Sequence, residues 1–188
     1  MEDRVKTDIL NVLKNSLEAI RKEDITELKN MSDHVIHDAS VYQDEYSISI
    51  AVIIYGIAKI FERVRYREYK DWNKFYRAIF ENLTKAYNTL KKGDIDDYEY
   101  NIHKIIQDLN KLDVRFKKNI SEVIERAKIS KASRLYEHGI STGRTAELLG
   151  ISEWELMEYV GGTGISDVRF NISKPINQRI KLIRSLFK

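Results

Sequence analysis

Residues 142–160 read TGRTAELLGISEWELMEYV, and no other part of the chain is as specific. Ala146 is small enough to let two helices approach closely. Gly150 follows four residues later, where a first helix can end in the left-handed conformation that glycine adopts at least cost. Ser152 and Glu155 have the spacing of a capping box, which starts a second helix. The stretch therefore predicts two short helices joined by a tight turn, a helix-turn-helix.

The apolar residues of this stretch recur at the spacing that a small helical core requires. We expect Ile151 to fill the turn, and Leu156 and Tyr159 to return at helical spacing and close the core. A helix-turn-helix commonly places its second helix in the major groove of DNA. The motif therefore points to nucleic acid as the class of partner.

A longer pattern surrounds the predicted turn and extends it toward the N-terminus. It consists of Tyr136, Gly139, Ile140, Ser141, Gly143, the run AELLGIS at 146–152, Glu155 and Leu156. With these residues, the segment 133–160 resembles a family of small prokaryotic helix-turn-helix proteins that are antitoxin-like or regulatory. The resemblance implies a DNA-binding regulatory role, either as a transcription regulator or as an antitoxin-like protein.

The charge of the predicted second helix does not favour DNA. Glu153, Glu155 and Glu158 lie on it, with no Lys or Arg between positions 152 and 160. Carboxylates repel phosphate, whereas DNA-binding proteins neutralise several phosphates with cations. A second interpretation therefore stays open, in which the protein is a non-enzymatic interaction adaptor and the motif is a packing unit.

Basic residues on both sides of the motif could supply the cations that the second helix lacks. Between positions 168 and 188 there are six basic residues and no acidic residue, and further cations precede the motif. Phosphate contacts of this kind position a protein on DNA. The residues that we predict to contact nucleic acid are Lys131, Arg134, Thr142, Arg144, Ser152, Trp154, Arg169, Lys174 and Arg179.

The sequence as a whole predicts an all-α protein, in which an N-terminal helical bundle is joined by a long helix to the C-terminal helix-turn-helix. Six of the eight glycines and the single proline lie after position 138, so the first two-thirds lack the turn residues of β-rich folds. Apolar residues at spacings of three and four continue from 95 to 127, which predicts one unbroken helix about 50 Å long. Further helices are expected at 4–21, 24–37, 45–63, 71–91, 131–138 and from 175 onward.

We expect this chain to divide into three segments. Residues 1–128 form the antiparallel bundle, which would serve dimerisation or partner binding. Residues 129–162 contain the helix-turn-helix, and residues 163–188 form a basic connector followed by an amphipathic helix. Double-stranded DNA and either a second copy of the chain or another protein are the expected partners.

Composition indicates a globular protein, because 43% of the 188 residues are hydrophobic and 32% are charged. The net charge of +3 requires any basic surface to be local. The longest apolar stretch, 48–61, contains Lys59 and is shorter than the ~20 residues that a membrane span needs. The N-terminus does not have the pattern of a signal peptide, so we expect a cytoplasmic protein without membrane contact.

Other chemistries find little support in the residues. The chain has no cysteine, and no grouping of Ser, His and Asp suggests a nucleophile, so we expect no enzymatic activity, no cofactor and no small-molecule substrate. His34 and Asp38 are one helical turn apart, but an exposed His beside an Asp is commoner than a metal site, and no metal is expected. Basic and aromatic residues alternate at 63–77. They could contact single-stranded nucleic acid, although core packing of the aromatics is the favoured interpretation.

Overall fold

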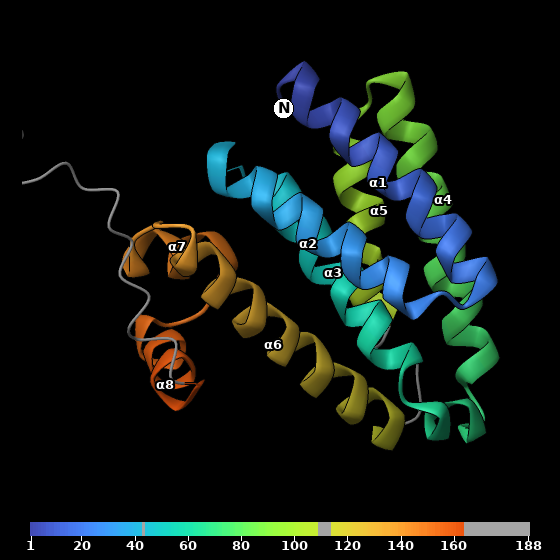
Figure 1. The fold of residues 1–188 in the computed structure, drawn as a ribbon. Coiled ribbons are helices and arrows are strands. Elements are labelled where there is room, and N and C mark those ends of the chain that lie inside the picture. Colours follow the sequence, from blue (N-terminus) through green and yellow to red (C-terminus); the bar gives the residue numbers. More distant parts are fainter. Residues whose placement is uncertain (43, 109–113, 164–188) are drawn as a thin grey trace, which may run out of the picture.

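The computed structural model describes residues 1–42, 44–108 and 114–163, and every regular element in them is helical (Figure 1). The predicted all-α class is therefore confirmed for this part of the chain. The elements are α1 (Asp3–Lys22), α2 (Ile25–Tyr42), α3 (Glu45–Phe61), the 3-10 helix η1 (Val64–Glu68), α4 (Trp72–Lys92), α5 (Ile95–Gln107), α6 (Val114–Glu137), α7 (Thr142–Leu149) and α8 (Glu153–Thr163).

Residue types explain three helix ends in this part of the chain: the end of α4, the start of α5 and the start of α3. Gly93 ends α4 with φ of 86°, after two lysines that complement the carbonyl end of the helix. The Asp94 carboxylate then accepts a hydrogen bond of 3.0 Å from the backbone N–H of Asp97 and starts α5. Asp44 caps α3 in the same way, by accepting from the N–H of Ser47 at 2.8 Å. The helix end predicted at Gly93 is confirmed.

The most apolar helix, α3, lies in the middle of the molecule. It packs against α2 and α6 and also touches α1 and α7, and its buried residues lie on most of its sides. Gly56 allows α6 to come close, because a Cβ atom at this position would lie 2.5 Å from Cδ1 of Ile124. In Figure 1, α1 and α4 lie on one side of the packed pair α2 and α3, and α7 and α8 lie at the C-terminal end of α6.

The predicted continuous helix at 95–127 is wrong. Helix α5 ends at Gln107 and packs on α4, whereas α6 begins at Val114 and packs on α3. The apolar spacing runs on through this region, but Asp108, Asn110 and Asp113 belong to residue types that compete with helical hydrogen bonds. The apolar periodicity alone therefore does not reveal that α5 ends and a separate helix, α6, begins.

Helix α6 also replaces the separate helix that was predicted at 131–138. It is one helix of 24 residues, and it crosses position 128, where we expected the first segment to end. The division into three segments stays a prediction. In the described structure, however, α6 packs both on the central helix α3 and on the C-terminal helices α7 and α8.

The aromatic residues near the start of α4 pack on one residue of α6. The ring of Phe116 stacks on Tyr69 at a centroid distance of 4.8 Å and makes an edge contact with Phe75 at 5.5 Å. Tyr66 and Trp72 surround the same ring. Tyr66 and Phe75 are therefore core residues and Tyr69 and Trp72 pack against the core, as the favoured interpretation of positions 63–77 expected.

Candidate nucleic-acid interface

Helices α7 and α8 meet at a tight corner, which we call the α7–α8 corner (residues 141–161). The Ser141 hydroxyl accepts a hydrogen bond from the N–H of Arg144 and starts α7. Gly150 ends α7 in the left-handed conformation, with φ of 61° and ψ of 39°. The predicted end of the first helix at Gly150 is thus confirmed.

A reciprocal pair of hydrogen bonds starts α8. The N–H of Ser152 donates to the Glu155 carboxylate at 2.8 Å, and the N–H of Glu155 donates to the Ser152 hydroxyl at 3.1 Å. The hydroxyl itself donates to the same carboxylate at 2.7 Å. These hydrogen bonds from Ser152 lower the pKa of Glu155 and keep it charged at the start of the helix. The capping box that the sequence predicted is present.

A small core holds the two helices against α6. Ala146 and Leu149 of α7 are buried, as are Leu156 and Val160 of α8. The prediction for Tyr159 is wrong, because 38% of this residue is exposed and Val160 closes the core in its place. At ~100° per residue, Val160 lies ~40° to one side of Leu156 and Tyr159 lies ~60° to the other. A narrow contact between helices buries only one of these two side chains.

The outer face of α8 is open to solvent. Trp154 is 79% exposed and Met157 is 45% exposed. The side chains of Glu153, Glu155 and Glu158 are exposed beside them. This helix is therefore held by its inner face and leaves an aromatic and acidic surface exposed.

Lys131 does not lie on the surface, so its predicted phosphate contact is wrong. The residue is 1% exposed, its Nζ lies 2.6 Å from Oδ1 of Asp33, and the ammonium lies 4.2 Å from the ring centroid of Tyr55. Burial lowers the pKa of Lys131, and the hydrogen bond to Asp33 opposes that shift. Sequence could not show this, because Asp33 lies 98 positions away.

The other predicted cations within the described residues remain accessible. Arg134 pairs with Glu137 at 3.1 Å and Arg144 pairs with Glu147 at 2.8 Å, each along its own helix, and both arginines are exposed. Exposed pairs of this kind contribute only ~0–1 kcal/mol, so a phosphate can replace the carboxylate. Arg169, Lys174 and Arg179 lie outside the described residues.

The remaining predicted contact residues differ in what they can offer. The Thr142 hydroxyl donates to the Glu153 carboxylate at 3.2 Å and thereby ties the start of α7 to the start of α8. The Ser152 side chain is occupied in the capping box. Trp154, by contrast, is open to solvent. Thr142 and Ser152 thus stabilise the corner itself, whereas Trp154 is exposed.

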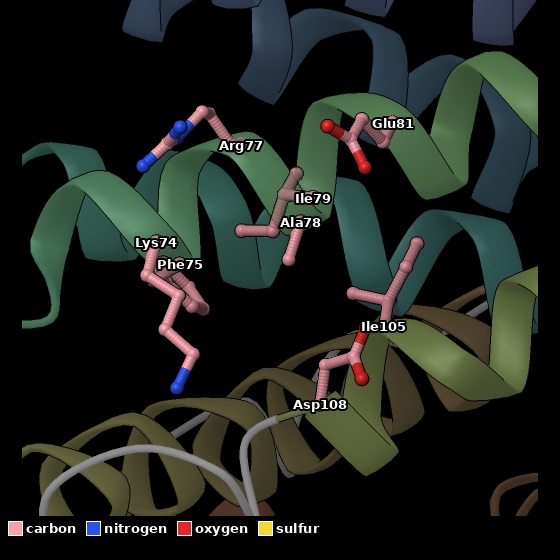
Figure 2. A pocket seen from close by; sticks show the side chains of 8 residues that line it. All are labelled: Lys74, Phe75, Arg77, Ala78, Ile79, Glu81, Ile105 and Asp108. Carbon is pink, nitrogen blue, oxygen red and sulfur yellow. The ribbon is translucent and has the colours of Figure 1, made fainter.

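Two cavities were not foreseen from the sequence. One lies between α4 and α5, with a volume of about 290 Å³, and Figure 2 shows Ala78 and Ile79 of α4 facing Ile105 of α5 across it. Its charged lining includes Lys74 and Arg77 together with Glu81 and Asp108, so it does not select the charge of a ligand. The other cavity, of about 240 Å³, is lined by residues of α3, α5, α6 and α7. Because its lining comes from four helices, no local pattern reveals it.

The histidine cluster considered from the sequence does not assemble into a larger set. His34 Nε2 lies 3.6 Å from Oδ2 of Asp38, and His37 contacts the same carboxylate. Among residues 1–42, 44–108 and 114–163, no three or more His, Asp or Glu side chains are grouped so that they could hold a metal ion.

Comparison with known proteins finds no matching family model, no matching curated protein and no matching solved structure. Within the described part of the chain, no helix combines the length and the apolar character that crossing a membrane requires.

Proposed function

We propose that the protein is a DNA-binding regulatory protein, either a transcription regulator or antitoxin-like, that uses the α7–α8 corner as a helix-turn-helix. One observation carries the proposal. The corner has a left-handed glycine, a capping box and a closed core, and it keeps the outer face of α8 in solvent. A helix buried on all sides could not enter a groove of DNA.

In this proposal, cations outside α8 supply the attraction to phosphate. Arg144 lies in α7 and Arg134 near the end of α6, and both are exposed. The six basic residues between 168 and 188 add to them. Two copies of the protein would place two corners on half-sites one helical turn of DNA apart. We place this role in the cytoplasm.

A second candidate function is favoured by the chemistry of α8 itself. Trp154 and Met157 form an exposed apolar surface, and Glu153, Glu155 and Glu158 surround it. Exposed Trp and Met are typical of protein interfaces, and carboxylates repel DNA. In this alternative, the corner is an adaptor that binds a protein carrying Lys or Arg around an apolar contact.

The two candidates predict opposite effects of one substitution. Binding of a labelled random 30-base-pair duplex, here called duplex retention, would be measured by fluorescence anisotropy at 50 and 200 mM KCl. For a DNA-binding corner, Arg144→Gln should weaken binding and reduce the salt slope by about one, because one phosphate contact is lost. Glu158→Gln should strengthen binding several-fold, because it removes a repulsive charge. Glu122→Gln, an exposed position on α6, is the matched control.

The measurement can also reject the DNA proposal. If the wild-type protein does not retain the duplex at 50 mM KCl, or if its retention does not depend on salt, the corner does not bind DNA. The adaptor function then remains. In that case Glu158→Gln should weaken the capture of a basic partner.

A further inference from the structure

We propose that the cavity between α3, α5, α6 and α7, here called the four-helix cavity, binds a small amphiphilic carboxylate that regulates the α7–α8 corner. The cavity has a volume of about 240 Å³. That is below the ~300–1,000 Å³ of pockets for drug-sized molecules, so the ligand is of small-metabolite size. Site and ligand are independent of the function proposed above, whereas the regulatory effect on DNA rests on it.

The walls of the four-helix cavity fix the apolar part of the ligand. Six of the nine lining residues are aliphatic, among them Ile53 of α3, Ile102 of α5 and Leu149 of α7. A saturated chain or a ring that fills this space gains roughly 25 cal/mol for each Å² of apolar surface removed from water. The walls therefore select a hydrocarbon body.

The polar lining fixes the charge of the ligand. Ser49, His103 and Lys128 are the lining residues with polar side chains, and no carboxylate is among them. The Lys128 side chain is largely covered, with 28% exposed, and its Nζ lies 3.1 Å from a carboxylate oxygen of the exposed Glu125. A ligand carboxylate can replace Glu125 there and accept a charge-assisted hydrogen bond from the Lys128 ammonium.

A neighbouring cavity orients the ligand. It shares Ser49, Ile102 and His103 with the four-helix cavity, and Glu45 and Glu99 lie in its lining. These carboxylates repel an anion from that end. The ligand carboxylate therefore lies toward Lys128, and its hydrocarbon part lies along α3 and α7.

The position of the cavity connects it to the corner. Leu148 and Leu149, which line it, are the last two residues of α7 and directly precede Gly150. Helix α7 also packs against α3. A ligand in the cavity therefore contacts the helix that sets the position of the corner relative to α3, so that it can favour one placement of α8.

The binding test uses the full chain and three probes of equal chain length: octanoate, octanol and octylamine. Isothermal titration calorimetry in the absence of DNA measures each affinity. We expect octanoate to bind more tightly than the other two. Lys128→Met should weaken octanoate binding about tenfold, since it removes one charge-assisted contact. Lys118→Met, an exposed position on the same helix, should leave it unchanged.

A second variant tests the location without touching α7. Ser49→Leu, at an exposed position of α3 that lines the cavity, narrows the space and should also reduce octanoate binding. The inference is overturned if octanoate does not bind, if octylamine or octanol binds as tightly, or if Lys128→Met and Ser49→Leu both bind octanoate like the wild type.

The regulatory effect has its own readout. Duplex retention at 50 mM KCl is measured with and without octanoate, and we expect at least a threefold change for the wild type and none for Lys128→Met. If octanoate binds but no duplex is retained, the DNA function fails and the site stands. If both bind and octanoate does not change retention, the regulatory role is overturned.

Discussion

Lys131 Nζ lies 2.6 Å from Oδ1 of Asp33, which joins α6 to α2. The same ammonium lies 4.2 Å from the ring centroid of Tyr55 on α3. Side chains of α2, α3 and α6 therefore meet at the Lys131 ammonium group. The lysine is buried, whereas 54% of the Asp33 side chain is exposed, so one end of the pair is dry and the other is hydrated.

This difference in exposure predicts that substitutions of Asp33 and of Lys131 change the stability of the protein by different amounts. Asp33→Asn leaves the buried ammonium without its anion and should destabilise the protein by ~1–3 kcal/mol. Lys131→Met keeps the side-chain length and removes the charge that folding must desolvate, so it should be closer to neutral. Urea unfolding at pH 7 measures both free energies. A larger loss for Lys131→Met than for Asp33→Asn would contradict this account.

The left-handed conformation of Gly150 predicts a specific cost for any side chain there. Apart from its chain neighbours, no atom of the described residues lies within 4 Å of a Cβ built at this position, so the cost is conformational and not steric crowding. Gly150→Ala should destabilise the corner by ~1–2 kcal/mol. Hydrogen exchange at the amides of Leu156 and Val160 reports it. Gly161→Ala, in α8 and equally uncrowded, is the control and should slow this exchange. Equal effects of the two substitutions would reject the argument.

The close approach of α3 and α6 predicts a non-additive pair of substitutions. Gly56→Ala places a methyl group 2.5 Å from the position of Ile124 Cδ1, so Ile124 must move. Ile124→Val removes that carbon and alone should cost ~0.5–1.5 kcal/mol. The double variant should be more stable than the sum of the single losses predicts, because the methyl group added at position 56 would occupy the vacated space. Thermal or urea unfolding of the four proteins measures this coupling, and strict additivity would exclude it.

Glu62 predicts how stability depends on acid pH. Lys29 and Lys59 donate to its two oxygens at 2.7 and 3.0 Å and hold the pKa of this carboxyl below its ordinary 4.5. The unfolded chain therefore binds the proton more readily than the folded chain. The contribution of Glu62 is present above pH 4.5 and is lost as the pH falls through the folded pKa.

Glu62→Gln should accordingly lower stability at pH 7 by no more than ~1 kcal/mol, because the pair is hydrated. The difference from wild type should shrink as the pH falls below 4.5, so that it is smaller at pH 3 than at pH 7. Parallel urea titrations at the two pH values measure it, with the exposed Glu81→Gln on α4 as the control. A difference of the same size at both pH values would show that the hydrogen bonds of the charged carboxylate are not its source.

The local patterns that predicted helix ends were reliable, because the groups that satisfy those ends lie within a few residues. Gly93, Gly150 and the Ser152–Glu155 pair all act as expected. The break after Gln107 was not predicted, because apolar residues continue at helical spacing through it. Elements that local hydrogen bonds define are thus easier to predict than the interruptions between them.

The candidate site was only partly predictable. The exposed acidic face of α8 follows from its sequence, and so does the accessibility of Arg144. The burial of Lys131 does not, because it depends on Asp33 and Tyr55, which belong to two other helices. The choice of Val160 over Tyr159 depends on the direction from which α6 meets α8. Both failures concern tertiary contacts, which the spacing of residues along the chain does not reveal.

The continuity of α6 has a consequence for how this sequence can change over evolution. Phe116 anchors one end of the helix in the aromatic cluster, and Leu135 is buried near the end that contacts α7 and α8. Inserting one residue between Phe116 and Lys131 would turn everything downstream by ~100° and carry Lys131 away from Asp33. Gain or loss of residues should therefore be tolerated in the surface connections and selected against in α6, whose length is as constrained as its chemistry.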